Sequence, residues 1–124
     1  MKIVGFFCNW CAYMAADLAG TMRLEYPSDI LIVRVMCSGR VQPEFVVNAL
    51  KNGADGVLIA GCHPGDCHYI HGNMIALRRY RMIRKVLEEL GINPRRVRLE
   101  WISASEPDRV KAVIKDFIED LKTL

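Results

Sequence analysis

The sequence lacks several features that would place the chain at a membrane or on nucleic acid. No apolar run approaches the ~20 residues that a membrane-spanning helix requires. A single lysine and a short apolar stretch open the chain, but no small-residue cleavage site follows, so we expect a first buried strand and not a signal peptide. The formal net charge of +3 is too small to indicate nucleic-acid binding by itself.

Linkers, internal repeats and low-complexity stretches are also missing from the sequence. The 124 residues are 52% hydrophobic and 25% charged, which is typical of a chain that folds around its own core. This length is close to that of an ordinary domain. We therefore expect residues 1–124 to form one folded domain.

Four short apolar runs alternate with four amphipathic segments. The runs are rich in β-branched residues and nearly continuous, which favours strands that are covered on both faces. Strict alternation of strand and helix predicts an α/β fold: a doubly wound, three-layer domain with a four-stranded parallel sheet, ordered 2-1-3-4, and helices on both faces. The predicted strands are 2–7, 30–35, 56–60 and 97–102, and the predicted helices lie near 11–25, 43–52, 71–90 and 106–122.

Proline and glycine support these boundaries. Pro43 stands where the first turn of a helix tolerates proline. Gly53 and Gly91 stand where the left-handed residue that ends a helix is expected. Ser105, with Asp108 three residues later, resembles an N-terminal capping pair for the last helix.

Five cysteines are the most unusual feature of the chain, and they follow the first three predicted strands. Parallel strands end at the same edge of a sheet, and neighbouring strands lie about 4.8 Å apart. The loops after these strands can therefore bring their thiols together, in the crevice where open α/β sheets bind ligands. The residues are Cys8 and Cys11 after the first strand, Cys37 after the second, and Cys62 and Cys67 after the third.

Three kinds of site use such a set of thiols. A thiol–disulfide oxidoreductase using Cys8 and Cys11 would leave the other three cysteines without a role. A zinc-stabilised binding module would use four thiolates, although a domain with its own core has no need of that staple. A 2Fe-2S cluster takes four cysteine thiolates and accepts them from several loops.

The segments "FFCNWCAY", "VMCSGRV" and "GCHPGDCHYIHGN", the basic "ALRRYRMIRKVLEELG" and the late "ISASEP" resemble the delta (iron–sulfur) subunit family of methyl-viologen-reducing hydrogenase. The resemblance spans nearly the whole chain. It implies one iron–sulfur domain with a 2Fe-2S cluster, acting in the cytoplasm of methanogens and related anaerobes. The family passes electrons between a nickel–iron hydrogenase, or a formate dehydrogenase, and the flavin-containing subunit (designated A) of heterodisulfide reductase. That assembly couples hydrogen oxidation to electron bifurcation in methanogenesis.

The same resemblance implies the site residues. All five cysteines match family cysteines, so cofactor binding and metal ligation are expected from Cys8, Cys11, Cys37, Cys62 and Cys67. Four of them would hold the cluster, and we favour the first three with one of the last two. No catalytic residue and no independent catalysis are expected.

Polar residues near the cysteines have weaker assignments. We expect His63, His68 and His71 to cap the following helix or to donate hydrogen bonds near sulfur. A run of five cations on the third helix indicates either a solvated face or a docking surface for an acidic protein partner, and no nucleic-acid or membrane partner is expected. These cations are Arg78, Arg79, Arg81, Arg84 and Lys85.

Overall fold

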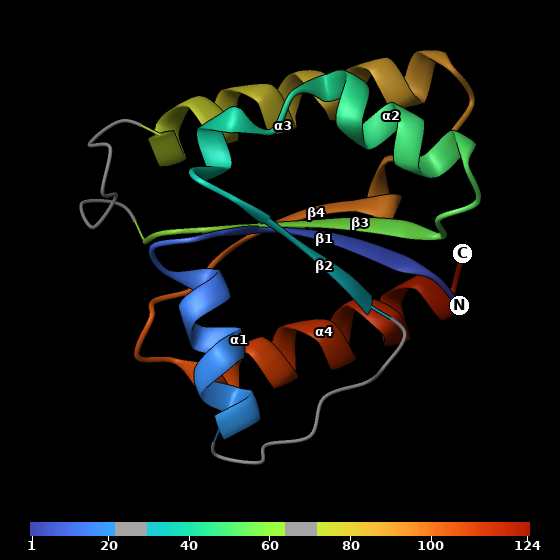
Figure 1. Ribbon diagram of the computed structural model, residues 1–124. Coiled ribbons are helices and arrows are strands. Elements are labelled where there is room, and N and C mark those ends of the chain that lie inside the picture. Colours follow the sequence, from blue (N-terminus) through green and yellow to red (C-terminus); the bar gives the residue numbers. More distant parts are fainter. Residues whose placement is uncertain (22–29, 64–71) are drawn as a thin grey trace.

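A four-stranded parallel sheet forms the centre of the molecule (Figure 1). The computed structural model describes residues 1–21, 30–63 and 72–124. The strand order is β2-β1-β3-β4, which confirms the predicted order 2-1-3-4. The strands are β1 (Ile3–Cys8), β2 (Ile30–Val35), β3 (Gly56–Gly61) and β4 (Val97–Trp101).

Helices cover both faces of this sheet, as the alternating sequence pattern predicts. Figure 1 shows α2 and α3 on one face and α1 and α4 on the other. In the described parts of the chain, no helix is both long enough and apolar enough to cross a membrane. The helices are α1 (Ala12–Thr21), α2 (Pro43–Lys51), α3 (Gly72–Glu89) and α4 (Pro107–Lys122), with 3-10 turns η1 (Ser38–Arg40) and η2 (Pro94–Arg96).

The core has two parts, one on each side of the sheet. Phe7 and Leu58 pack with Phe117 of α4 on one side, whereas Phe6 and Leu87 belong to the cluster on the other. All six residues of β3 are buried, as expected for a strand with helices on both faces. The centre of the sheet therefore matches the predicted pattern of burial.

The expectation that every strand is covered on both faces is wrong for β2. This strand lies at an edge of the sheet, and Leu31 is 67% exposed. The apolar run "ILIVRV" looks like a central strand because its composition does not show where the strand stands in the sheet. Because β2 is an edge strand, some of its apolar side chains are not covered by a helix.

The turn residues behave as predicted, except at the start of α4. Pro43 opens α2, and Gly53 and Gly91 have positive φ values of 102° and 75°. The capping pair predicted from Ser105 is wrong, because the N-cap position belongs to Glu106 and no side chain caps the helix there. Pro107 sets the first turn instead. The predicted helical residues 22–25 lie outside the described residues.

Candidate metal centre

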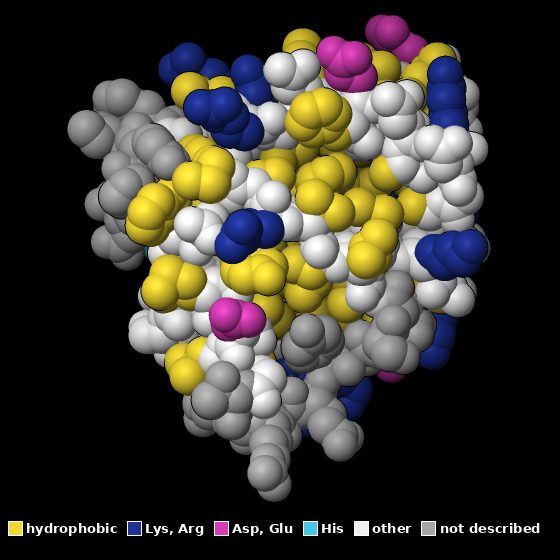
Figure 2. Space-filling view, in the orientation of Figure 1, with side chains coloured by type: hydrophobic (Ala, Val, Ile, Leu, Met, Phe, Trp, Pro, Cys, Tyr) yellow, Lys and Arg dark blue, Asp and Glu magenta, His cyan; other side chains and the backbone are white. Residues whose placement is uncertain are grey.

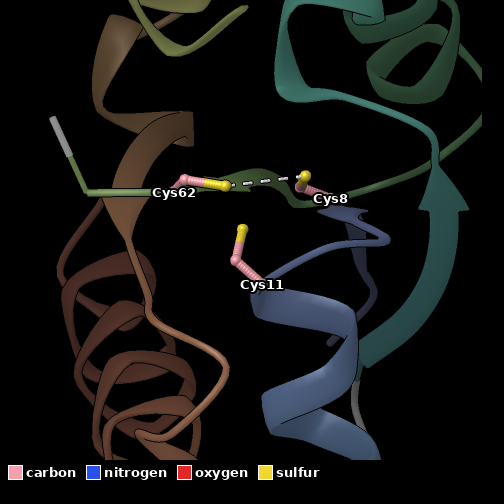
Figure 3. A group of neighbouring side chains, drawn as sticks. All are labelled: Cys8, Cys11 and Cys62. Atoms are coloured by element: carbon pink, nitrogen blue, oxygen red, sulfur yellow. Dashed lines mark hydrogen bonds between the residues drawn. The ribbon is translucent and has the colours of Figure 1, made fainter. Parts of the chain in front are cut away.

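Three cysteine side chains meet at the edge of the sheet where the strands end (Figure 3). Cys8 is the last residue of β1, Cys11 immediately precedes α1, and Cys62 immediately follows β3. Their sulfur atoms all lie within 4.8 Å of one another, and all three residues are buried. The predicted convergence of thiols is thus present for these three residues.

The spacing of the sulfur atoms suits shared metal ligation. Sγ of Cys8 and Sγ of Cys62 lie 3.9 Å apart, well beyond a disulfide bond of about 2.05 Å. Two thiolates on one tetrahedral metal atom, each at about 2.3 Å, are about 3.8 Å apart. A donor set of thiols alone is what iron–sulfur clusters and structural zinc sites use. The residues present therefore fit either group.

The surroundings of Cys8 favour the ionised, thiolate form of its side chain. A hydrogen bond from the Cys11 thiol is the largest cause that lowers its pKa, to about 6 from the ordinary value of 9.0. The backbone N–H groups of Trp10 and Ser38 also donate to its sulfur, while burial opposes the shift. Because metals bind the thiolate form, this arrangement favours ligation near neutral pH.

The surroundings of Cys11 favour the protonated form of its thiol. Its hydrogen bond to the Cys8 sulfur raises the pKa of the Cys11 thiol, and burial raises it further. The two thiols therefore share one proton in the metal-free protein, and Cys11 keeps it. A bound cation would displace that proton by compensating the second negative charge.

The two remaining cysteines do not join this group of described residues. Cys37 is buried after β2 and caps η1, where its sulfur accepts the backbone N–H of Gly39 at 3.4 Å. It lies outside the set of three whose sulfur atoms are mutually within 4.8 Å. Cys67 lies outside the described residues.

Asn73 fixes the segment that carries Cys62. Its side-chain amide donates to the carbonyl oxygen of Cys62 at 3.3 Å and to that of His63 at 3.1 Å. The residue is buried in the first turn of α3, beyond the loop that separates it from Cys62. The sequence pattern did not reveal this role, and its only signal was a polar residue at a position that proves to be buried.

The same end of α3 holds the turn that follows Cys37. A Cβ atom built on Gly39 would lie 2.8 Å from the carbonyl oxygen of Gly72, so the two backbones are in direct contact. The guanidinium group of Arg79 also donates to the carbonyl oxygen of Gly39. Helix α3 therefore positions the segments after both β2 and β3.

The histidine next to Cys62 has a partner on another element. Nε2 of His63 lies 2.5 Å from Oε1 of Glu106, directly before α4. A bond from the backbone N–H of Ser103, followed by the bond with His63, lowers the pKa of Glu106. The sequence analysis did not anticipate this bond of His63, and His68 and His71 lie outside the described residues.

The cations of α3 are of two kinds. Arg79 contacts Gly39, and Arg84 donates to the hydroxyl group of Tyr80 at 3.2 Å. Arg78, Arg81 and Lys85 are exposed. The predicted basic surface is accordingly smaller than the sequence suggests.

Comparisons with known proteins agree on one family. A profile of the family "Methyl-viologen-reducing hydrogenase, delta subunit" matches residues 3–124. The iron–sulfur subunit (designated D) of the F420-non-reducing hydrogenase of Archaeoglobus profundus is 57% identical over 123 residues, 99% of this chain and 90% of that protein. The ferredoxin/F(420)H(2)-dependent CoB-CoM heterodisulfide reductase of Methanosarcina acetivorans has a subunit (designated A) that is 51% identical over 122 residues, 98% of this chain but 15% of that longer protein.

Proposed function

The chain belongs to the delta-subunit family of methyl-viologen-reducing hydrogenase, and on that basis we propose that it is an electron-transfer subunit carrying one 2Fe-2S cluster. It would relay electrons between a nickel–iron hydrogenase and the flavin subunit of heterodisulfide reductase, in the cytoplasm. A formate dehydrogenase is the alternative donor. The convergence of Cys8, Cys11 and Cys62 at one edge of the sheet is the observation that carries this proposal.

Iron is favoured over zinc by the names of the relatives. Subunits of similar length that share 57% and 54% of their residues with this chain are called iron–sulfur subunits. A bound cluster would supply the chemistry by taking up and releasing one electron at a time. The chain's own contribution is to hold thiolates in a dry position and to supply N–H donors to sulfur.

We propose Cys8, Cys11 and Cys62 as three of the cluster ligands, with either Cys37 or Cys67 as the fourth. Their sulfur atoms lie within 4.8 Å of one another, and the donors around Cys8 favour its charged form. Cys37 is buried next to a backbone N–H donor, so it could serve either as a ligand or as a neighbouring thiol.

Anaerobic purification followed by iron and sulfide analysis, visible spectra and paramagnetic resonance tests the proposal. We expect two irons and two sulfides per chain and a paramagnetic signal on reduction. A colourless protein with stoichiometric zinc would instead support a binding module. Disulfide reduction by metal-free protein would support a thiol–disulfide oxidoreductase that uses Cys8 and Cys11.

Serine substitution at each cysteine then identifies the ligands. We expect four of the five variants to lose or distort the cluster and one to resemble the wild type. Substitution of Cys8, Cys11 or Cys62 should be among the damaging changes, because serine oxygen replaces a thiolate of the central group. Two or more silent substitutions would exclude a site made only of cysteines.

A further inference from the structure

The thiols of the candidate centre are buried, so a partner can exchange electrons with them only across the residues that cover them. Trp10 and Met36 are among the residues that contact the sulfur of Cys8 through their backbones. The N–H group of Trp10 donates to this sulfur, and the carbonyl oxygen of Met36 lies 3.8 Å from it. The side chains of the same two residues are 38% and 47% exposed. The backbone of each residue therefore touches the buried thiol while its side chain is partly exposed.

Two more apolar side chains are exposed at this end of the molecule. Met74 is 45% exposed and Ile75 is 41% exposed, both in the first turn of α3. The preceding Asn73 bonds to the carbonyl of Cys62, and Gly72 contacts Gly39 in the turn after Cys37. These contacts place the start of α3 beside the segments that carry the thiols.

We call Trp10, Met36, Met74 and Ile75 the thiol-end patch. Figure 2 shows separate hydrophobic side chains on the left of this face, where the strands end, beside a wider hydrophobic area at its centre. Large apolar side chains exposed together commonly mark a binding surface. Because these residues lie beside the thiols proposed as cluster ligands, we expect the surface to serve electron exchange with a protein partner.

Three exposed cations lie near the thiol-end patch. Arg40 of η1 is exposed, and so are Arg78 and Arg81 in the first half of α3. Residues 72–81 contain no acidic side chain. An apolar patch with a basic border is complementary to an apolar surface with carboxylates around it.

We propose that the thiol-end patch is the surface on which this chain binds the flavin subunit of heterodisulfide reductase, through an apolar area bordered by carboxylates. The inference rests on the proposed function. The choice of the reductase follows from relatives in which the matching region forms 15% of a heterodisulfide reductase chain, so that one polypeptide carries both parts. The hydrogenase is the competing occupant of the patch.

Two methionines of α3 provide a matched test. Met74 and Met82 are 45% and 50% exposed, and they lie eight residues apart, about 12 Å along the helix. Met74→Glu places a negative charge in the patch, whereas Met82→Glu makes the same change outside it. Affinity of the cluster-loaded protein for the purified flavin subunit of the reductase should fall at least tenfold for Met74→Glu and stay within twofold for Met82→Glu.

Met36→Glu gives a second probe on a different element and decides the matter if Met74→Glu does not fold or loses its iron. It should also weaken binding at least tenfold. Arg78→Glu should weaken binding and reduce its dependence on salt concentration, because the charge that attracts carboxylates is removed. Iron content and circular dichroism confirm that each variant retains its cluster and fold.

The outcomes separate the two levels of the proposal. If the wild-type protein binds neither the flavin subunit of the reductase nor the hydrogenase, the proposed function is wrong. If it binds the flavin subunit but the patch variants Met36→Glu and Met74→Glu bind as well as Met82→Glu, the surface assignment is wrong. If the patch variants lose affinity for the hydrogenase and keep it for the flavin subunit, the occupant is wrong.

Discussion

At the scale of single residues, several hydrogen-bond donors reach the sulfur of Cys8. Its sulfur accepts hydrogen bonds from the thiols of Cys11 and Cys62 and from the backbone N–H groups of Trp10 and Ser38, and together these outweigh the effect of burial. Hydrogen bonds to the charged form favour that form. One ligand is therefore ionised before any metal arrives, and Cys11 holds the proton that must leave.

This arrangement predicts the titration of the metal-free protein. Thiolate absorbance in the ultraviolet should increase as pH rises through about 6, with an amplitude of one thiolate, because Cys8 loses its proton there. In Cys11→Ala the largest stabilising donor is absent, so the transition should move upward, toward the ordinary value of 9.0. Cys8→Ala should abolish the transition near pH 6, and its persistence there would assign it to another thiol.

Asn73 predicts a second effect at residue scale. Asn73→Ala removes two donors and leaves the carbonyl groups of Cys62 and His63 unpaired, at a cost of about 1–3 kcal/mol for each buried group. The position of Cys62 should also become less fixed. Affinity of the metal-free protein for Co²⁺, measured by thiolate-to-metal charge-transfer absorbance, should fall by roughly 10–100-fold, as for other residues that orient ligands.

A general loss of stability has to be distinguished from loss of ligand position. Ile83→Ala is the matched control, because Ile83 is buried on the same helix but belongs to the core cluster of Phe6 and Leu87. It should destabilise the protein by about 2–5 kcal/mol and leave Co²⁺ affinity unchanged. Equal losses of affinity in both variants would show that Asn73 acts only through stability.

At the scale of elements, α3 connects the segments after two strands. Its first turn bonds to the carbonyl of Cys62, and its backbone touches η1 at Gly39. Arg79 adds a hydrogen bond to the same turn. The helix therefore determines how the segment carrying Cys37 stands relative to the segment carrying Cys62.

Gly39→Ala tests this packing. The added Cβ would lie 2.8 Å from the carbonyl oxygen and 3.1 Å from Cα of Gly72, and backbone atoms cannot rotate away. We expect the free energy of unfolding in urea to fall by about 1–3 kcal/mol, as for overpacked sites. Gly20→Ala in α1 meets no atom within 4 Å and should stabilise the protein by roughly 0.5–1 kcal/mol. Equal effects of the two changes would contradict the contact.

At the scale of the whole molecule, the two edges of the sheet are protected differently. On β4, Arg98 pairs with Asp116 at 2.7 Å and with Asp120 at 2.9 Å, and charged side chains on an edge strand discourage pairing with other strands. On β2, Leu31 is largely exposed and Arg34 is the one charged residue of the strand. The β4 edge therefore carries paired charges, whereas the β2 edge exposes apolar side chains.

Much of this organisation was predictable from the sequence. The apolar runs and the glycines at 53 and 91 indicated the strand order and the helix ends, because local conformation and right-handed crossovers leave few alternatives. The exposure of Leu31 was not predictable, since it depends on which neighbours a strand has. The capping prediction at Ser105 failed because the helix begins at Pro107, which puts Glu106 and not Ser105 at the N-cap position.

The sequence by itself determined that thiols following β1 and β3 meet, because parallel strands must end at the same edge of a sheet. Only the tertiary structure decided which thiol is ionised, that Asn73 bonds to the carbonyl of Cys62, and that the set of sulfur atoms within 4.8 Å of one another includes Cys62 but not Cys37. The physical reason is the distance over which each kind of interaction acts. Strand order follows from patterns repeated along the chain, whereas a donor reaches a sulfur atom only over a few ångströms, at angles that the packed backbones impose.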